Sequence, residues 1–337
     1  MDSIIVSEKQ KIGVIGGGSW ATALVKMLLN NADTVHWWVR KEATAEHLKT
    51  YGHNPNYISS IEFDTNKINV TTNVTEVVQN CDILFFAIPS AFVHDTIKDI
   101  PKSVFTDKIV VSAIKGIVPE FHQIPASYFS EYFGVNINDM AIVSGPCHAE
   151  EVAQEKLSYL TIASPTQGRG EMISELLACR YIKVSTNDDL AGTEFSAVLK
   201  NIYAIATGIC HGLGYGDNFT AVLISNAIQE VAGFLQAVYP KNRDVKSSAY
   251  LGDLLVTAYS QFSRNRTFGG MIGKGYSVKF AQVEMGMIAE GYYACKSIQV
   301  ICEKVGYEMP IASTIYKCLY TNANPRKVFI ELQSKLT

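Results

Sequence analysis

A short apolar run followed by a glycine-rich turn constrains the fold more than any other feature of this sequence. Residues 11–15 are typical of a strand and lead into Gly16-Gly17-Gly18-Ser19-Trp20-Ala21, the pattern G-x-G-x-x-A. In a dinucleotide-binding turn the first glycine, Gly16, allows the tight turn, and Gly18 lets the backbone approach a pyrophosphate. The helix start that follows offers unpaired N–H groups to the phosphates. Because the pattern lies between a strand and a helix, we favour this interpretation over a glycine turn of another α/β protein.

The first half of the chain predicts a doubly wound α/β domain. Apolar runs alternate with segments of helical period such as 20–29, and runs without polar alternation are typical of strands covered by helices on both faces. The expected strands are 12–15, 35–39, 83–88, 109–114 and 141–143. Their order, strand then helix, predicts a Rossmann-type parallel sheet.

The second half predicts a helical domain. Its long apolar stretches have no strand-like breaks and are expected to be buried helices. They are 192–212, 219–238, 248–263 and 278–305. A chain of 337 residues also exceeds one usual core. We therefore expect a dinucleotide-binding domain over 1–190 and an all-α substrate and catalytic domain over 191–337, with the boundary near 188–192.

Composition narrows the class of protein. With 47% hydrophobic residues, 18% charged residues and a net charge of −3, the chain is typical of a globular protein that does not bind nucleic acid. The most apolar run, 83–93, contains Pro89 and is too short to span a bilayer, and the first ten residues lack a signal-peptide pattern. Seven cysteines without C-x-x-C, and histidines without ligand spacing, indicate a reduced cytoplasmic protein without a metal site.

The end of the second expected strand bears on the choice of cofactor. NAD-specific enzymes often carry Asp or Glu about twenty residues after the glycines, but Arg40 takes that place here, followed by Lys41 and Glu42. A guanidinium suits a 2′-phosphate or stacks on adenine. Glu42 is close enough in the sequence to bind a ribose hydroxyl. An equally good interpretation is that Lys41 and Glu42 are solvent-exposed charges after a strand. The sequence favours NADP without excluding NAD.

Two charged residues interrupt apolar helical runs. Lys200 has no acidic neighbour three or four positions away, and a buried ammonium without a partner is costly. Its partner must come from elsewhere, and Asp253, in a second apolar run, is a candidate. A lysine of this kind is readily depressed in pKa and becomes a candidate general acid and base. The alternative, a lysine that extends along a domain surface, fits the spacing equally well.

Three further segments are candidates for a site. Lys115 follows an expected strand, where side chains face the ligand crevice. The segment 263–266, Ser-Arg-Asn-Arg, suits an anion, or is a solvated helix end. The turn 144–151 presents backbone N–H groups and opens a helix with acids in its first turn. Within it we reject Cys147 and His148 as a thiol nucleophile pair, because adjacent side chains at a helix start do not face each other.

Together these segments resemble the bacterial NAD(P)-dependent glycerol-3-phosphate dehydrogenases. The resemblance runs from Ile12 to about Lys317, and the order and spacing of its blocks are specific. The blocks are GGGSWATAL (16–24), FFAIPS (85–90), KGI (115–117), SGPCHAEEV (144–152), GTEFSAVLKNIYAIATGI (192–209), GLGYGDN (212–218), LGDLLVT (251–257), SRNRTFG (263–269) and AEG (289–291).

The resemblance implies reversible hydride transfer between NAD(P)H and dihydroxyacetone phosphate to give glycerol 3-phosphate, for glycerophospholipid synthesis. Lys200 would be the proton acceptor in oxidation, with Lys115 and Asp253 beside it. The implied cofactor contacts, with the turn glycines, are Ser19, Trp20, Arg40, Lys115, Ala149, Arg264, Ile288 and Glu290. The implied substrate contacts are Lys115, Gly145, Cys147, Lys200, Asp253, Ser263, Arg264 and Asn265.

The chain departs from the family pattern at three places. Ala21 stands where Gly is usual, which requires only slightly looser helix packing. Cys147 stands where Ser or Thr is usual, and a thiol is a weaker hydrogen-bond partner. The segment 121–133 is unlike the common pattern and receives no role.

Two alternatives stay open at this point. Another dehydrogenase of the same two-domain plan, acting on a 3-hydroxy acid or ketopantoate, would bind a carboxylate with the same arginine. A dinucleotide-binding regulator would need the glycine turn but not Lys200 and Asp253 inside apolar helices. The expected partner is a small phosphorylated substrate, with no nucleic acid and no transmembrane segment. The sequence does not show the oligomeric state, and a homodimer is kept as an alternative to a monomer.

Overall fold

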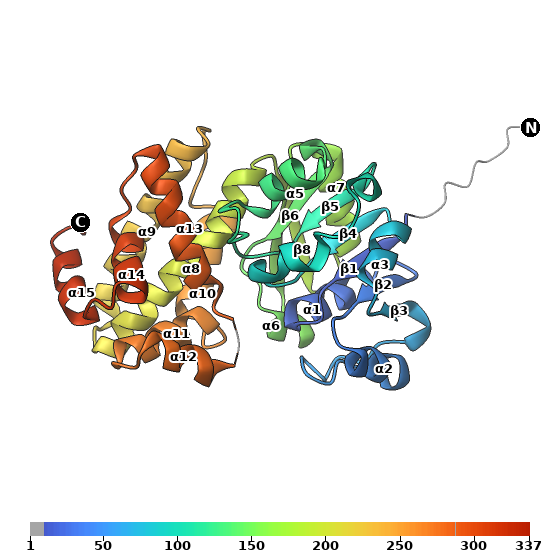
Figure 1. The fold of residues 1–337 in the computed structure, drawn as a ribbon, viewed down its shortest axis with the longest axis horizontal. Coiled ribbons are helices and arrows are strands. Elements are labelled where there is room, and N and C mark those ends of the chain that lie inside the picture. The colour runs from blue at the N-terminus through green and yellow to red at the C-terminus, as the bar shows by residue number, and fades with distance from the viewer. Residues whose placement is uncertain (1–9, 287) are drawn as a thin grey trace, which may run out of the picture.

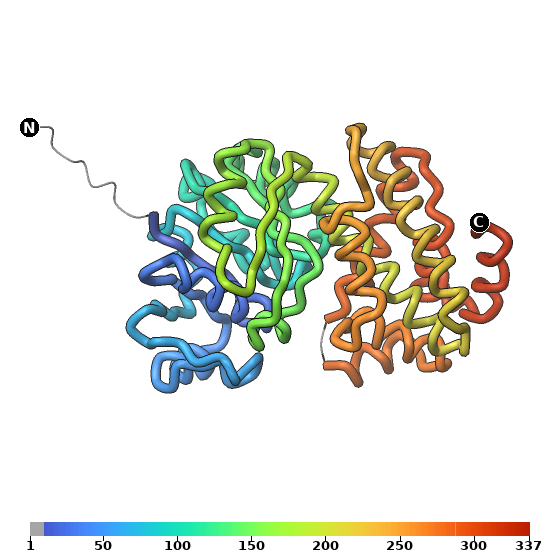
Figure 2. The backbone as a smooth tube through the Cα atoms, turned by 180° about the vertical axis from the view of Figure 1, so that it is seen from behind, coloured from blue at the N-terminus to red at the C-terminus, as the bar shows by residue number. Residues whose placement is uncertain are grey.

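The chain folds into an α/β half and a helical half that lie side by side (Figure 1). The computed structural model describes residues 10–286 and 288–337. The N-terminal segment 1–9, whose sequence lacks a signal-peptide pattern, lies outside the described residues. Seen from behind, the C-terminus lies at the outer end of the helical half, far from the sheet (Figure 2). The predicted fold class, a Rossmann-type α/β unit followed by an all-α unit, is confirmed.

One eight-stranded sheet, in the order β3-β2-β1-β4-β5-β6-β7-β8, forms the first half. Its strands are β1 (Ile12–Ile15), β2 (Val35–Trp38), β3 (Ile68–Thr71), β4 (Ile83–Phe86), β5 (Ile109–Ser112), β6 (Met140–Ser144), β7 (Ser158–Ala163) and β8 (Ile182–Asn187). All neighbours pair in parallel except β6 and β7, which are antiparallel. The strand order reverses between β1 and β4, and ligands of such sheets bind beyond the carboxyl ends of the strands at that point.

The structure extends the predicted sheet by three strands, β3, β7 and β8. The strand β3 lies at one edge and alternates buried and exposed residues, and β8 lies at the other edge, half exposed. Edge strands of this kind lack the continuous apolar run on which the prediction relied. The predicted strands 83–88 and 109–114 end earlier, although Ala87 and Ala113 still donate their backbone N–H groups to the neighbouring strands. The difference there is one of strand ends only.

Helices cover both faces of the sheet and give it two cores. Successive side chains of a strand point to opposite faces, so Val14 packs with the first core and Ile15 with the second. The helices are α1 (Ser19–Leu28), α2 (Glu42–Tyr51), α3 (Val74–Asn80), α4 (Val93–Ile97), α5 (Pro125–Phe133), α6 (Ala149–Ala153) and α7 (Gln167–Leu177). Short 3-10 turns occur at 65–67, 90–92, 102–105 and 137–139.

The helical half is built around one long buried helix, α8 (Leu190–Leu213). Around it lie α9 (Asp217–Val238), α10 (Asp253–Tyr259), α11 (Arg264–Gly273), α12 (Val278–Met285), α13 (Glu290–Val305), α14 (Pro310–Tyr320) and α15 (Pro325–Gln333). Glycines let α8 and α11 cross closely, because a Cβ atom on Gly208 would collide with the carbonyl oxygen of Arg266. This close crossing places the start of α11 beside the middle of α8.

Two of the predicted helical stretches are interrupted. The stretch 278–305 forms two helices, because Gly286 adopts a left-handed conformation with φ 57° and ends α12. The stretch 248–263 begins as a π-helical turn, Ser248–Gly252, continues as α10, and leaves the helix after Tyr259.

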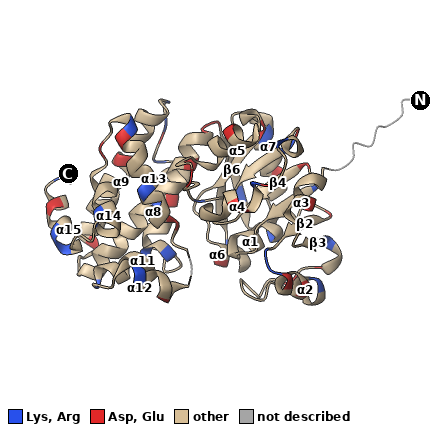
Figure 3. Cartoon of the chain, in the orientation of Figure 1, with Lys and Arg blue, Asp and Glu red and all other residues tan. Residues whose placement is uncertain are grey.

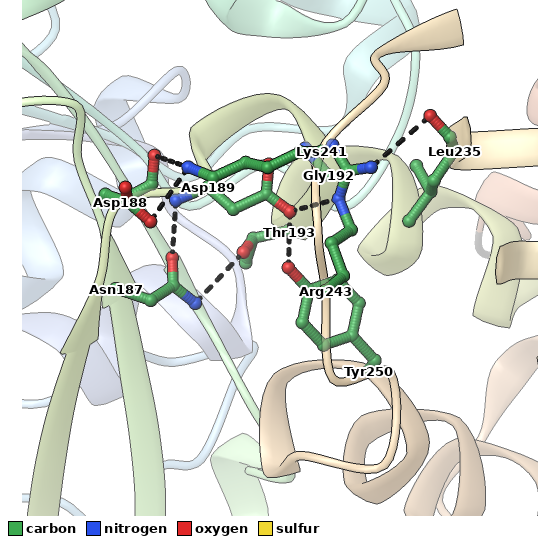
Figure 4. Close-up of polar contacts among 9 residues, drawn as sticks. All are labelled: Asn187, Asp188, Asp189, Gly192, Thr193, Leu235, Lys241, Arg243 and Tyr250. Atoms are coloured by element: carbon green, nitrogen blue, oxygen red, sulfur yellow. Dashed lines mark hydrogen bonds and ion pairs between the residues drawn. The ribbon is translucent and has the colours of Figure 1, made fainter. Parts of the chain in front are cut away.

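The junction between the halves is held by a buried ion pair at the start of α8 (Figure 4). Asp189 caps the helix by accepting from the N–H of Gly192 at 3.2 Å. The same carboxylate accepts from Arg243 Nε at 2.5 Å and from the hydroxyl of Tyr250 at 2.6 Å. Burial opposes ionisation of Asp189, but the bonds from Arg243 and Tyr250 still hold its pKa below the usual value. The loop before α10 is thereby fastened to the end of the sheet.

The segment 121–133 also joins the two halves. It supplies α5, whose Tyr128, Phe129 and Phe133 are buried against the sheet. Just before it, Ile124 packs into the core of the helical half. Segment 121–133, which is unlike the common family pattern, therefore packs against both halves of the protein.

Within the described residues, α9 is the one helix long and apolar enough to cross a membrane. A core helix can pass the same test, and α9 buries Leu223, Val231 and Phe234 in the helical core. It also carries Glu230, whose carboxylate accepts from the N–H of Ile311 at 2.7 Å.

Acidic and basic residues are interspersed over both halves (Figure 3).

Candidate active site

The glycine turn lies at the carboxyl end of β1 and has the conformation that its sequence predicts. Gly16 has φ 147°, and a Cβ atom there would collide with the carbonyl oxygen of Ala87, so only glycine fits. A Cβ atom on Gly18 would meet nothing within 4 Å. Ser19 begins α1, and Gly18 at the N-cap supplies no side-chain cap. The turn therefore presents an open, uncapped helix start of the kind that binds anions.

Trp20, the residue after Ser19 in α1, lies close to Lys115, which follows β5. The Nε1 atom of Trp20 is buried and has no hydrogen-bond partner among the described residues. The Lys115 ammonium lies 6.0 Å from the centroid of the Trp20 ring and donates to the carbonyl oxygen of Val143 at 2.8 Å. Burial, aided by the charge of Lys200 and opposed by that of Asp253, lowers the pKa of Lys115 to about 8.

A buried ion pair joins α8 to α10. Lys200 Nζ lies 2.5 Å from Oδ1 of Asp253, and both side chains are at least nine-tenths buried. The second carboxylate oxygen of Asp253 accepts from the hydroxyl of Ser144, at the end of β6, at 3.3 Å. The partner expected for Lys200 from elsewhere in the fold is therefore Asp253, and the alternative of a surface lysine does not hold.

The side-chain amides of Asn201, the residue after Lys200, and Asn265 form a series of hydrogen bonds. Asn201 donates to the carbonyl oxygen of Lys115 at 2.6 Å, and Asn265 donates to Asn201 at 2.9 Å. Asn265 in turn accepts from the N–H of Gly291 at 2.9 Å. These bonds connect the turn after β5 with α8, α11 and α13.

The segment 263–266 is divided between structural and exposed groups. Ser263 is buried and caps α11 by accepting from the N–H of Arg266 at 3.3 Å. Asn265 is buried in this series of amide hydrogen bonds, with one N–H of its two still available. Arg264 is exposed at the first position of α11. Arg264 is therefore the exposed arginine of this segment, whereas Arg266 is half-buried.

Glu290, at the start of α13, connects the helical half to the segment after β4. Its two oxygens accept from the N–H of Ser90 at 2.9 Å and from the hydroxyl of Ser90 at 2.5 Å. Burial raises the pKa of Glu290, although the bonds from Ser90 oppose that shift. Ile288, two residues before Glu290 in the sequence, helps to line a cavity of about 320 Å³ with Phe268 and Tyr292.

The turn between β6 and α6 borders the ion pair. Gly145 has φ 109°, and a Cβ atom there would stand 2.8 Å from the carbonyl oxygen of Tyr159. Ala149 begins α6 and is buried. Burial raises the pKa of the Cys147 thiol to about 12. A thiol with that pKa stays protonated near neutral pH, which supports the rejection of a cysteine nucleophile.

Arg40 follows the carboxyl end of β2. It is exposed, and its guanidinium carbon stands 5.6 Å from the centroid of the Phe92 ring. Glu42 is occupied by a bond from the hydroxyl of Thr72 at 2.7 Å. Arg40 is therefore more available than Glu42 to a bound ligand.

Two polar residues of the site, Ser90 and Asn201, received no role from the sequence, and Ser144 was named only as the first residue of the candidate turn 144–151. Asn201 carried a usable signal, because it is a polar residue in the same apolar run as Lys200. Ser90 follows a strand and carries no such signal, since serine is common in turns. The described residues contain no group of three or more His, Cys, Asp or Glu side chains that could hold a metal ion.

The chain matches two family models over most of its length. The model described as NAD-dependent glycerol-3-phosphate dehydrogenase N-terminus matches residues 11–169, and the one described as its C-terminus matches residues 189–330. A relative from Streptococcus agalactiae serotype III (strain NEM316), named glycerol-3-phosphate dehydrogenase [NAD(P)+], is 32% identical over 327 residues, which cover 97% of this chain and 96% of the relative. One of the same name from Clostridium botulinum (strain Eklund 17B / Type B) is 33% identical over 322 residues, 96% of each chain.

Two solved structures superpose on this chain over nearly its full length. A glycerol-3-phosphate dehydrogenase from Coxiella burnetii superposes with a TM-score of 0.88 at 27% identity, covering 96% of this chain and 99% of that one. A ketopantoate reductase from Ralstonia eutropha JMP134 superposes with a TM-score of 0.59 at 15% identity, covering 96% of this chain and 100% of that one. The second likeness concerns the fold alone.

Proposed function

We propose that this chain, which belongs to the NAD-dependent glycerol-3-phosphate dehydrogenase family, uses Lys200 as the general acid and base of its reaction. The chain is an NAD(P)-dependent glycerol-3-phosphate dehydrogenase, which interconverts glycerol 3-phosphate and dihydroxyacetone phosphate. The observation that carries the residue assignment is the buried Lys200–Asp253 ion pair, which faces the turn after β6. The same proposal assigns 1–190 to dinucleotide binding and 191–337 to substrate and catalysis, a division supported by the start of α8 at Leu190.

The residues around the glycine turn fit a dinucleotide. The open space at Gly18 suits a pyrophosphate, and the orphaned Nε1 of Trp20 is a buried donor without a protein partner among the described residues. Bound nicotinamide would supply or accept the hydride. The proposed cofactor contacts are Gly16, Gly18, Ser19, Trp20, Arg40, Lys115, Ala149, Arg264, Ile288 and Glu290. With Glu42 bonded to Thr72, the exposed Arg40 favours a cofactor with a 2′-phosphate.

The proton moves at Nζ of Lys200. In reduction, the Lys200 ammonium stabilises the developing alkoxide and donates its proton, and in oxidation neutral Lys200 accepts that proton. Asp253 holds the ammonium in place, and Ser144 holds Asp253. A second cation, Lys115, borders the same space and adds to the positive potential felt by the alkoxide.

The substrate is held at the end remote from its reacting carbon. Arg264 presents an exposed guanidinium at the start of α11, where a phosphate also meets the helix N-terminus. The proposed substrate contacts are Lys115, Gly145, Cys147, Lys200, Asp253, Ser263, Arg264 and Asn265. Cys147 as a protonated thiol would contribute packing and only a weak hydrogen bond.

The test is the loss of nicotinamide absorbance with purified protein and dihydroxyacetone phosphate, run in parallel with NADH and NADPH. Rapid oxidation with dihydroxyacetone phosphate and none with ketopantoate is expected. A preference for ketopantoate would instead favour the related reductase. An Arg40→Ser variant should lose more activity with NADPH than with NADH, and equal losses would contradict the assigned contact with the 2′-phosphate.

The proposal also includes the metabolic role, the cellular location and the oligomeric state of the enzyme. Its product would supply glycerol 3-phosphate for glycerophospholipids, and a cytoplasmic location is supported by seven free cysteines. The homodimer stays a prediction, which sedimentation of the purified chain would test.

A further inference from the structure

The backbone carbonyls of the glycine turn are all held from outside the turn. Each accepts one hydrogen bond from a side chain. The pairs are Trp37 Nε1 to Gly16 at 2.6 Å, Asn54 Nδ2 to Gly17 at 3.1 Å and Thr22 Oγ1 to Gly18 at 3.0 Å. Thr22 belongs to α1 and Trp37 to the neighbouring strand β2, whereas Asn54 comes from the loop after α2.

Asn54 is fully buried and its amide is completely used. Nδ2 donates to the carbonyl oxygen of Gly17 and, at 2.9 Å, to the hydroxyl oxygen of Thr22. Oδ1 accepts from the backbone N–H groups of Asn56 at 3.0 Å and Tyr57 at 3.2 Å. Only one orientation of the amide satisfies all four groups, because two are acceptors and two are donors. Asn54 is therefore rigidly fixed between its own loop and the glycine turn.

The bond to Gly17 determines where the next N–H group points. In a trans peptide the carbonyl of one residue and the N–H of the next point in opposite directions. With the Gly17 carbonyl directed to Asn54, the N–H of Gly18 is directed to the other side of the peptide. A peptide between two glycines rotates easily in the absence of such a restraint. The space at the Gly18 Cα is open, as a bound pyrophosphate would require.

We propose that Asn54 is a positioning residue for the dinucleotide: it locks the Gly17–Gly18 peptide so that the N–H of Gly18 faces the pyrophosphate. The inference rests on dinucleotide binding as part of the proposed function. Asn54 lies 37 residues from Gly17 and outside the glycine fingerprint. Its effect is on cofactor affinity, because it touches neither the proton-transfer groups nor the substrate contacts.

The test compares Asn54→Asp and Asn54→Ala with the unmodified full chain. Dissociation constants for NADH and NADPH are measured by nicotinamide fluorescence without substrate, and kcat is measured at saturating dinucleotide. Asn54→Asp should bind about tenfold more weakly, which corresponds to about 1.4 kcal/mol, because a carboxylate repels the Gly17 carbonyl. Asn54→Ala should show a smaller loss, and kcat should stay within about twofold in both variants, since the proton-transfer groups are untouched.

Two comparisons separate positioning from general stability. Asn73→Ala removes an asparagine of the same half that caps α3 by accepting from the N–H of Glu76 at 3.3 Å, away from the turn. It should lower the thermal midpoint and leave the dissociation constants unchanged. In Asn54→Asp, affinity should recover as the pH falls, because the protonated carboxyl can donate one hydrogen bond to Gly17, while the unmodified chain should show no such recovery.

Wild-type dissociation constants in both Asn54 variants, or a fall in kcat without a change in affinity, would overturn the role of Asn54 alone. Failure of the unmodified chain to bind either dinucleotide would overturn both this inference and the proposed function. If Asn54→Asp does not fold, the affinity of Asn54→Ala decides between these outcomes.

Discussion

The backbone N–H of Ala126, in the first turn of α5, donates a hydrogen bond of 3.0 Å to the carboxyl group of Glu194 in the buried helix α8. This contact joins the sheet half to the helical half. Glu194 is fully buried, and its second oxygen has no hydrogen-bond partner among the described residues. Burial raises the pKa of Glu194 to about 7, against the lowering effects of Ala126, Ser112 and Lys115.

Glu194 predicts a loss of stability with rising pH. Because its pKa is raised on folding, its contribution to the free energy of unfolding is complete below the unfolded value of 4.5 and is lost as the pH rises to about 7. Glu194→Gln keeps an acceptor for Ala126 but does not titrate. Between pH 5 and 8, the unmodified chain should therefore lose up to about 3 kcal/mol relative to this variant.

Chemical denaturation across that pH range measures the effect. Glu175→Gln, an exposed substitution in α7, is the matched control and should follow the unmodified chain. Parallel pH profiles for Glu194→Gln and the unmodified chain would show that Glu194 is ionised in the folded state at all these pH values.

Lys200→Met should abolish proton transfer while leaving dinucleotide binding intact. The substitution keeps an unbranched side chain of similar volume and removes the ammonium, so kcat should fall by about 10²- to 10⁴-fold. It also leaves Asp253 without its cation, so a lower thermal midpoint is expected. Lys279→Met, at an exposed position of α12, controls for loss of a lysine. Turnover within a few-fold of the unmodified enzyme would refute the general acid and base role.

Arg264→Ala should weaken phosphate binding more than it slows the reaction. A charged hydrogen bond of this kind contributes about 1.5–3 kcal/mol, so the KM for dihydroxyacetone phosphate should rise by roughly 10- to 100-fold. Steady-state kinetics with Arg326→Ala, an exposed arginine of α15 far from the site, provide the comparison. An unchanged KM in Arg264→Ala would remove this residue from the substrate site.

Gly116→Ala should disrupt the bridge between Ser90 and Glu290. A Cβ atom at position 116 would collide with Oε2 of Glu290 and Oγ of Ser90, so both bonds to the carboxylate must lengthen or break. The expected result is a loss of about 1–3 kcal/mol in the free energy of unfolding and weaker dinucleotide binding. Gly168→Ala in α7, where a Cβ atom meets nothing within 4 Å, should be close to neutral. Equal stability of the two variants would contradict a tight bridge.

The inner strands and the long helices could be predicted because their signal is local. Strands β1, β4 and β5 are continuous apolar runs, as expected for strands covered on both faces. The edge strands β3 and β8 are partly exposed to solvent, so their amino-acid patterns resemble those of surface segments. The break after α12 depended on one glycine with positive φ, a conformation that apolar periodicity does not reveal.

The sequence by itself determined the alternation of inner strands and helices in the first half, the helical second half, the glycine turn and the fact that Lys200 needed a distant partner, because these follow from neighbouring residues. Only the tertiary structure decided which groups meet. Lys200 and Asp253 are 53 residues apart, and Ser90 and Glu290 are 200 apart. Such contacts depend on how α8, α10 and α13 cross and where the sheet ends, and those crossings are set by packing of whole elements rather than by any local pattern.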